Sequence, residues 1–143
     1  MSDSKSEEEI SASIENILNY VDDTYGEKRD YQKMQEIMTD PSCVFHKTKM
    51  VFDEYPLQES EFANMHQVDK NPSKGFVLYM HPFFRTNELA LPLLMAYHFV
   101  IVNYGINVNA SHAEQLGAGL NKIDLESYYQ KLCSLSDSIP VTK

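Results

Sequence analysis

The sequence predicts an α+β domain in which a small antiparallel sheet of about three strands packs against one buried helix. Three observations support this: apolar residues recur at helical spacing near both ends of the chain, residues 44–81 alternate as strands do, and residues 89–102 are apolar on nearly every face. Because the predicted helices precede and follow the strands, α+β is favoured over alternating α/β. The 143 residues are expected to form one domain, 1–143, with loose termini at 1–6 and 138–143.

Two amphipathic helices are expected before the strands. The first covers residues 7–25 and ends near Gly26, with acidic residues in its first turn, where the helix dipole favours negative charge. The second is shorter and ends at Asp40-Pro41, since the residue before a proline avoids helical geometry. Their apolar faces are formed by Ile10, Ile14, Ile17, Leu18 and Val21 in the first helix, and by Tyr31, Met34, Ile37 and Met38 in the second.

Three strand candidates follow, at residues 44–55, 62–68 and 75–80. The segment 69–74 (DKNPSK) is rich in turn-forming residues, so the last two strands are expected to form a hairpin. A turn centred between Asn71 and Pro72 places His66 opposite Val77 and Phe62 opposite His81. One face then carries Phe62, Asn64, His66, Val77, Tyr79 and His81, and the more apolar face, expected to cover helices, carries Ala63, Met65, Phe76, Leu78 and Met80. A slip of one residue would exchange these faces.

The buried central helix is expected at about residues 88–103. It begins either near Thr86, which can cap it, or near Leu91 with Pro92 in the first turn, and it ends at Tyr104-Gly105. A helix that is apolar all round is enclosed by its own domain or forms part of an oligomer interface. A homodimer is therefore one expectation from this segment.

The C-terminal part is again helical. Residues 111–114 (SHAE) have the spacing of a capping box and are expected to open a short helix that Gly117 and Gly119 terminate. Asp124 is expected to cap a last amphipathic helix, whose apolar side chains are Leu125, Tyr128, Tyr129, Leu132 and Leu135.

Charge and composition exclude several classes of function. The net charge is −9, and residues 1–40 hold eleven acidic against four basic residues. This distribution disfavours nucleic-acid binding and permits a basic partner, but its ordinary explanation is a solvated helix face that aids solubility. The N-terminus lacks the pattern of a signal peptide, and the longest apolar stretch, 89–102, is too short to cross a bilayer. With only Cys43 and Cys133, the chain is expected to be cytoplasmic with reduced thiols and no membrane contact.

No motif assigns a cofactor or a catalytic residue. The sequence lacks the glycine-rich phosphate loops, the GxSxG elbow, the HExxH zinc motif and the EF-hand loop. No two of the five histidines stand three or four residues apart, the spacing at which helical side chains converge on a metal. Neither a metal nor an organic cofactor is therefore predicted.

The histidines of the apolar region are nevertheless the best candidates for a site. His81 ends a strand directly before proline and two phenylalanines, and Arg85 follows, which together could hold a small anionic or aromatic ligand. The predicted ligand-binding residues are His66, Tyr79, His81, Arg85 and His98. The alternative is structural: His81 binds a nearby backbone group, and His98 is a neutral, hydrogen-bonded core residue with a tyrosine hydroxyl as one possible partner. The tyrosines Tyr79, Tyr97, Tyr104, Tyr128 and Tyr129 could line a pocket or an interface, or fill the core.

The function expected from these features is non-enzymatic. The chain is predicted to be a small acidic protein of binding type that associates with itself or binds a protein partner, which could be basic. The alternative is a small enzyme or metal-binding protein that uses His81 and His98, with His66 or Glu88, in a pocket between the sheet and the central helix.

Overall fold

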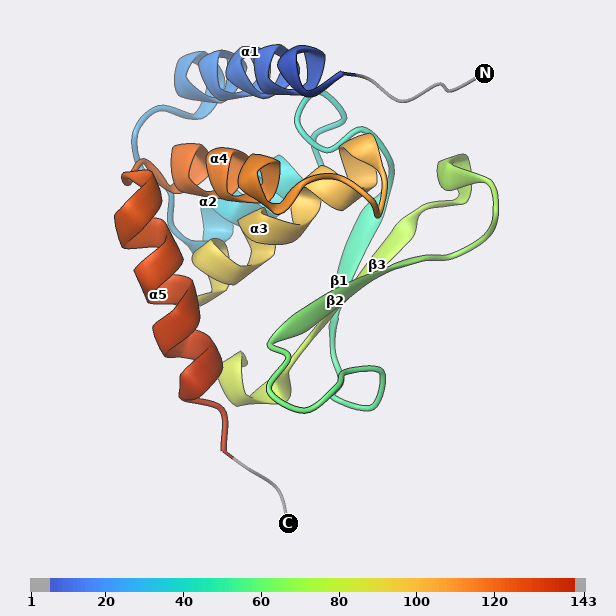
Figure 1. Cartoon of the computed structure of the whole chain (residues 1–143), viewed down its shortest axis with the longest axis vertical. Coiled ribbons are helices and arrows are strands. Elements are labelled where there is room, and N and C mark those ends of the chain that lie inside the picture. Colours follow the sequence, from blue (N-terminus) through green and yellow to red (C-terminus); the bar gives the residue numbers. More distant parts are fainter. Residues whose placement is uncertain (1–5, 141–143) are drawn as a thin grey trace.

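The computed structural model describes residues 6–140, and in this range the chain is an α+β protein with one small sheet (Figure 1). In chain order the main elements are α1 (Glu7–Tyr25), α2 (Tyr31–Met38), β1 (Thr48–Phe52), β2 (Ala63–Gln67), β3 (Phe76–Met80), α3 (Leu91–Tyr104), α4 (Ala110–Asn121) and α5 (Leu125–Asp137). Short 3₁₀ turns at Pro72–Lys74 and Pro82–Phe84 flank β3. The predicted order of helices, strands and helices is confirmed.

Helix α1 begins and ends as its sequence predicts. The Glu9 backbone N–H donates to Ser6 Oγ at 3.1 Å while the Ser6 N–H donates to Glu9 Oε1 at 2.9 Å, a reciprocal capping box. Gly26 ends the helix with φ of +77°, a conformation that favours glycine. Of the termini expected to be loose, residues 1–5 and 141–143 lie outside the described range, whereas Ser6 is this cap and Ile139 is buried.

The sheet is mixed, so the prediction of a purely antiparallel sheet is wrong for one pair of strands. Strand β3 lies in the centre, antiparallel to β2 and parallel to β1, with Thr48 opposite Phe76. The hairpin register is the predicted one, because His66 lies opposite Val77 and the His81 N–H donates to Phe62 O at 2.8 Å. The chain passes from β1 at one edge of the sheet to β2 at the other edge, and then returns through the hairpin as β3, which fills the position between them. Strand β3 therefore runs parallel to β1.

The two faces of the hairpin differ in burial as expected. The apolar face is buried throughout and consists of Ala63, Met65, Phe76, Leu78 and Met80. On the opposite face His66 is exposed and Asn64, Tyr79 and His81 are half-buried. Phe62 is an exception, because its ring turns towards α3 and contacts Tyr97 and His98. The apolar face therefore covers the helices, and on the opposite face Val77 is buried as well.

Helix α3 is the centre of the molecule and is enclosed by its own chain. It begins at Leu91 with Pro92 in the first turn, the second of the two predicted starts, and spans 91–104 instead of 88–103. It contacts α4 most extensively, and also α2, α5, β2 and β3. Its buried residues are Leu91, Pro92, Leu94, Met95, Ala96, His98, Phe99, Val100 and Val102. Because a single chain covers this helix, its apolar character does not require a second copy.

Helix α4 differs from the prediction at both ends. Its N-cap is Asn109, whose side chain accepts from the Ser111 N–H at 2.9 Å, so Ser111 lies inside the helix and does not cap it. Gly117 and Gly119 do not terminate the helix either, since it continues to Asn121. They allow close packing: a Cβ on Gly117 would lie 2.2 Å from the Tyr128 hydroxyl, and one on Gly119 would lie 2.4 Å from a Leu18 methyl.

Helix α5 closes one side of the molecule: it begins beside the end of α4 and descends past the start of α3, and it contacts both helices (Figure 1). Asp124 caps it as predicted, accepting from the Ser127 N–H at 3.1 Å. Tyr128 anchors it to α3 by donating its hydroxyl to Leu93 O at 2.6 Å. Among residues 6–140 we find no helix with both the length and the apolar content needed to cross a bilayer.

Candidate ligand-binding site

The five residues predicted to bind a ligand lie in three separate places. His66 and Tyr79 form one pair on the open face of the sheet, with ring centroids 5.1 Å apart. They are diagonal neighbours, since His66 lies opposite Val77 and Tyr79 opposite Asn64. This pair is a cross-strand contact with one exposed ring.

His81 and Arg85 lie at the end of β3, where each has a structural partner. His81 Nδ1 accepts from the Phe83 N–H at 3.0 Å and so caps the 3₁₀ turn that follows. The Arg85 guanidinium lies over the Phe52 ring at 5.3 Å from its centroid, a cation–π contact. His81 also lines a shallow pocket of about 310 Å³ with Glu54 and Glu59.

His98 is buried in α3. Its Nδ1 is 3.0 Å from Leu94 O, and because a carbonyl oxygen only accepts, this nitrogen holds the proton. The ring meets Phe62 and Tyr97 edge to face, at centroid distances of 5.6 and 5.4 Å. Burial lowers the pKa of the imidazole and outweighs the backbone groups of Leu94 and Ala63, which favour the protonated form. The partner is thus a backbone carbonyl and not a tyrosine hydroxyl.

The structure does not bring the histidines to one cavity. His98 lines a pocket beside α5, His81 lines a different one, and His66 lies on the open sheet face. Within residues 6–140 no three side chains of His, Cys, Asp or Glu are grouped so that they could hold a metal ion. A shared site of His81, His98 and Glu88 therefore gains no support from the geometry.

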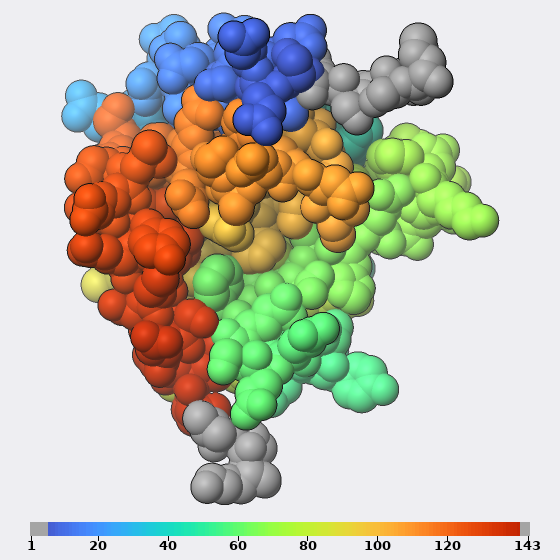
Figure 2. Space-filling view, viewed as in Figure 1, coloured from blue at the N-terminus to red at the C-terminus, as the bar shows by residue number. Residues whose placement is uncertain are grey.

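The pocket beside His98 is lined by aromatic rings, two carboxylates and a thiol, and we name it the Tyr97 pocket. It has a volume of about 340 Å³ and opens between α3, α4, α5 and the segment that leads into β2. Figure 2 shows this hollow, with a small part of α3 at its base between α4, α5 and the green segment. Its lining residues are Ser60, Glu61, Phe62, Ala63, Tyr97, His98, Glu114, Tyr129, Leu132, Cys133 and Ser136.

Hydrogen bonds fix the rim of the Tyr97 pocket. Ser136 Oγ on α5 donates to Ser60 O at 2.9 Å and joins the helix to the segment before β2. The Glu61 carboxylate accepts from the Gln58 N–H at 3.0 Å and from Asn64 Nδ2 at 3.1 Å, so both of its oxygens are engaged. The opening is thus held by contacts between distant segments.

The charged groups of the Tyr97 pocket are all acidic. Glu61 and Glu114 line it, His98 is neutral, and no lysine or arginine from the described part of the chain takes part. Burial raises the pKa of Tyr97, and the negative charge of Glu114 adds to this shift. A hydrogen bond with Cys133 raises the pKa of Tyr129, again with a contribution from Glu114. Both phenols therefore stay protonated at neutral pH.

The reactive side chains of the Tyr97 pocket are His98 and Cys133. His98 could act as a base only through Nε2, because its Nδ1 proton is bonded to Leu94 O, and the ring is only 7% exposed. Cys133 lies at the exposed edge, where its hydrogen-bonding neighbour is a phenol that remains protonated. Aromatic walls with few polar groups are typical of ligand sites.

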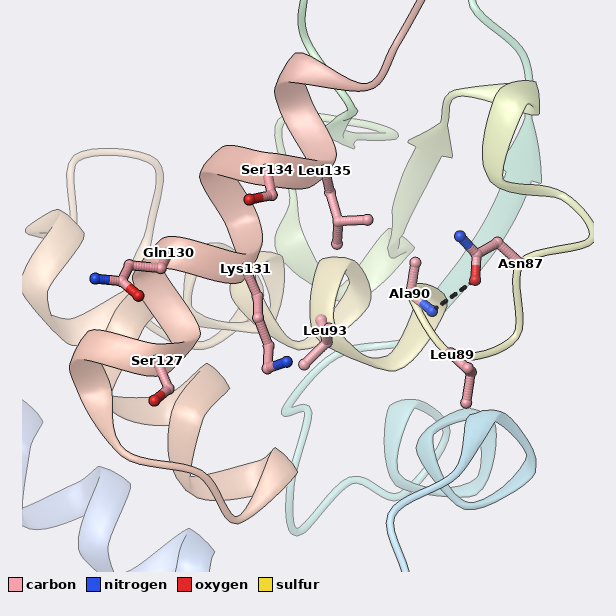
Figure 3. Close-up of a pocket in the computed structure, with 9 residues that line it drawn as sticks. All are labelled: Asn87, Leu89, Ala90, Leu93, Ser127, Gln130, Lys131, Ser134 and Leu135. Atoms are coloured by element: carbon pink, nitrogen blue, oxygen red, sulfur yellow. Dashed lines mark hydrogen bonds between the residues drawn. The ribbon is translucent and has the colours of Figure 1, made fainter.

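A larger groove lies between α5 and the start of α3, with a volume of about 640 Å³. Figure 3 shows Lys131 and Leu135 extending from α5 towards Leu93 and Ala90, while Asn87 accepts from the Ala90 N–H at 3.1 Å. Lys131 is the one charged residue among those lining it. Although this groove is larger, its described lining has no aromatic ring and a single charged side chain, so it is a weaker candidate for a site than the Tyr97 pocket.

Of the Tyr97 pocket, the sequence identified His98 as a site residue and named Tyr97 and Tyr129 among five tyrosines with several possible roles. It missed Glu114 and Cys133. One signal was available, because positions 129, 132, 133 and 136 share one face of a helix and mix polar with apolar side chains. That stripe indicates a boundary position, but nothing in the sequence places it beside Tyr97.

The comparisons with known proteins add no relative: no protein-family model, curated protein or solved structure matches this chain.

Proposed function

We propose that this protein is a non-enzymatic binding protein that takes up its ligand in the Tyr97 pocket. The observation that supports this most strongly is the composition of the pocket: the rings of Phe62, Tyr97 and Tyr129 line it, yet its histidine is neutral and hydrogen-bonded to backbone. Such a lining can enclose a small group and orient it. It offers no paired nucleophile and base.

Three aromatic probes of matched shape and different charge test the proposal: phenol, benzylammonium and benzoate. Each is titrated into ¹⁵N-labelled protein while amide shifts are followed by NMR. We expect at least one probe to shift the amides of Phe62, Tyr97 and Glu114 saturably and to be recovered unchanged. Absence of saturable shifts for all three probes contradicts the proposal, and chemical conversion of a probe favours an enzyme.

The partner that we propose is basic, in agreement with the charge of the chain. Within residues 6–40 the cations are already paired with acids: Arg29 with Asp22, Lys28 with Asp30, and Lys33 with Glu36. Residues 1–40 hold eleven acidic against four basic residues, so seven of the chain's nine excess negative charges lie in this region. A surface of this sign accelerates the association of basic ligands and is sensitive to salt.

Self-association and a cytoplasmic location remain predictions. Helix α3 is covered by its own chain, so the apolar segment that motivated a homodimer is accounted for within one copy. Sedimentation velocity over about a hundredfold range of protein concentration decides between monomer and dimer, because a dimer dissociates by mass action on dilution. Cell fractionation tests the location.

A further inference from the structure

We infer that the Tyr97 pocket selects an alkylated ammonium group, a tertiary or quaternary organic cation. This inference rests on the proposed function and names the class of ligand for the same site. It follows from the charge, the ring content and the hydrogen-bonding capacity of the lining.

The Tyr97 pocket contains a carboxylate whose negative charge is not compensated within the described chain. The Glu114 carboxylate lines the pocket and makes no hydrogen bond or ion pair with any residue from 6 to 140. It lies close enough to Tyr97 and Tyr129 to affect both phenols. A half-buried carboxylate that lacks a partner favours a cation beside it. No described lysine or arginine of the pocket can supply one.

Three aromatic rings line the same pocket. Phe62 and Tyr97 lie edge to face with centroids 6.3 Å apart, and Tyr129 lines the same pocket from α5. Aromatic rings attract cations through their quadrupole, and aromatic cages are a known way of binding methylated ammonium groups. A neutral aromatic ligand would pack against the rings but would not compensate the negative charge of Glu114.

The free acceptors of the pocket are few beyond Glu114. A primary ammonium group needs three acceptors for its N–H bonds. Both Glu61 oxygens already accept a hydrogen bond, and Ser136 Oγ and Ser60 O are bonded to each other, so Glu114 is the carboxylate of the described lining that remains free. A tertiary or quaternary ammonium presents one N–H or none, so the Glu114 charge and the aromatic rings can hold it without further acceptors. The pocket therefore favours an alkylated ammonium over an unmodified lysine side chain, because alkyl groups, unlike N–H bonds, are satisfied by contact with aromatic faces.

Choline and 3,3-dimethylbutan-1-ol provide the test, because the alcohol has nearly the same shape without the charge. We expect choline to shift the pocket amides saturably and to bind at least about tenfold more tightly than the alcohol, a factor that corresponds to one cation–π and carboxylate contribution of ~1.4 kcal/mol. The same titration in 0.5 M sodium chloride, about three times physiological ionic strength, should weaken choline alone.

Two variants assign the effect to residues. Glu114→Gln keeps the shape and removes the charge, and should weaken choline about tenfold while leaving the alcohol unchanged. Tyr129→Leu removes a ring that is 54% exposed, so the fold tolerates it, and should weaken choline about threefold to fivefold. The matched control is Glu15→Gln on the exposed side of α1, which should leave both affinities unchanged.

The source of the cation is distinguished by a short peptide with one central trimethyllysine. Tighter binding of the peptide than of choline identifies a modified side chain of a protein partner, and equal binding identifies a free small molecule. Equal affinity for choline and the alcohol, or an unchanged choline affinity in Glu114→Gln, overturns the inference. The proposed function is then judged separately by the aromatic probes.

Discussion

At the scale of single residues, His98 shows how burial decides what a histidine can do. Its Nδ1–H is committed to Leu94 O, and its ring is enclosed by Phe62 and Tyr97. Burial lowers its pKa, so the folded state binds this proton less readily than the unfolded state does. The stabilising contribution is present above the unfolded pKa of about 6.5 and is lost as the pH falls below it.

We therefore expect wild type to lose more stability between pH 7.5 and pH 5.5 than His98→Gln does. The glutamine can still donate to a backbone carbonyl, but it does not titrate. Urea unfolding at several pH values measures the free energy of unfolding directly. Parallel pH profiles for the two proteins would show that His98 is not responsible for the acid sensitivity.

His112 presents the opposite case, a buried ring without partners. It is 6% exposed, and neither ring nitrogen has a hydrogen-bond partner within the described range. Leaving a buried polar group unpaired costs about 1–3 kcal/mol.

His112→Leu is accordingly expected to raise the free energy of unfolding by about 1 kcal/mol. The control is His66→Leu at an exposed position, expected to change stability by less than about 0.5 kcal/mol. Thermal and urea unfolding compare the two. A loss of stability in His112→Leu would mean that the ring has a polar role in the folded protein.

Arg29 is a cation with a buried side chain, and its exposed neighbour in the sequence, Lys28, provides a matched control for its effect on stability. Its side chain is only 3% exposed, and it donates to Gly26 O, to Leu120 O at 2.8 Å and to Asp22. It thereby joins the end of α1 to the end of α4, and the hydrogen bond lowers the pKa of Asp22.

Arg29→Met should destabilise the protein by about 2–4 kcal/mol, because the Gly26 and Leu120 carbonyls lose this donor and Asp22 keeps only Lys122 of its described partners. Lys28→Met, at a side chain that is 79% exposed, should cost less than about 1 kcal/mol. Urea unfolding at neutral pH measures both. Equal effects would contradict a bridging role for Arg29.

At the scale of elements, α4 depends on two glycines that differ in what surrounds them. Gly117 faces the rigid, fully buried ring of Tyr128, whereas Gly119 faces the half-buried, flexible end of Leu18. Within a helix interior, alanine is otherwise favoured over glycine by about 1 kcal/mol.

Gly117→Ala is therefore expected to cost about 1–3 kcal/mol, since the added methyl group collides with a ring that cannot move easily. Gly119→Ala should stay within about 1 kcal/mol of wild type, because Leu18 can change rotamer and helix propensity compensates. Thermal unfolding of both variants checks the difference. Gly117→Ala should also weaken the bond from Tyr128 to Leu93, which holds α5 on α3.

The elements also show why part of the fold could be predicted and part could not. The hairpin was predictable because its register depends on local information: the turn at 69–74 places His66 opposite Val77. By contrast, the parallel pairing of β1 with β3 joins segments that are separated in sequence by all of β2, so no local pattern predicts it. Gly117 and Gly119 were misread as helix ends because their partners, Tyr128 and Leu18, lie on other helices.

At the scale of the whole molecule, the same limit applies to the candidate site. His98 could be found from its setting in an apolar helix, and its neutral structural state was one of the predicted alternatives. Glu114 and Cys133 could not be found, because only packing brings α4 and α5 to the segment before β2. Whether the predicted residues converge depends on the tertiary structure, and His66, His81 and His98 lie apart.

The central position of β3 has a consequence for how the protein reaches its native state. Its pairing with β2 closes a short turn, whereas its pairing with β1 closes a loop that contains all of β2. Closing the longer loop costs more chain entropy, so the nucleus should contain the hairpin, and β1 should dock afterwards. Until β1 arrives, one edge of β3 offers unpaired backbone groups to any other extended chain, and this late intermediate is the species most prone to aggregation.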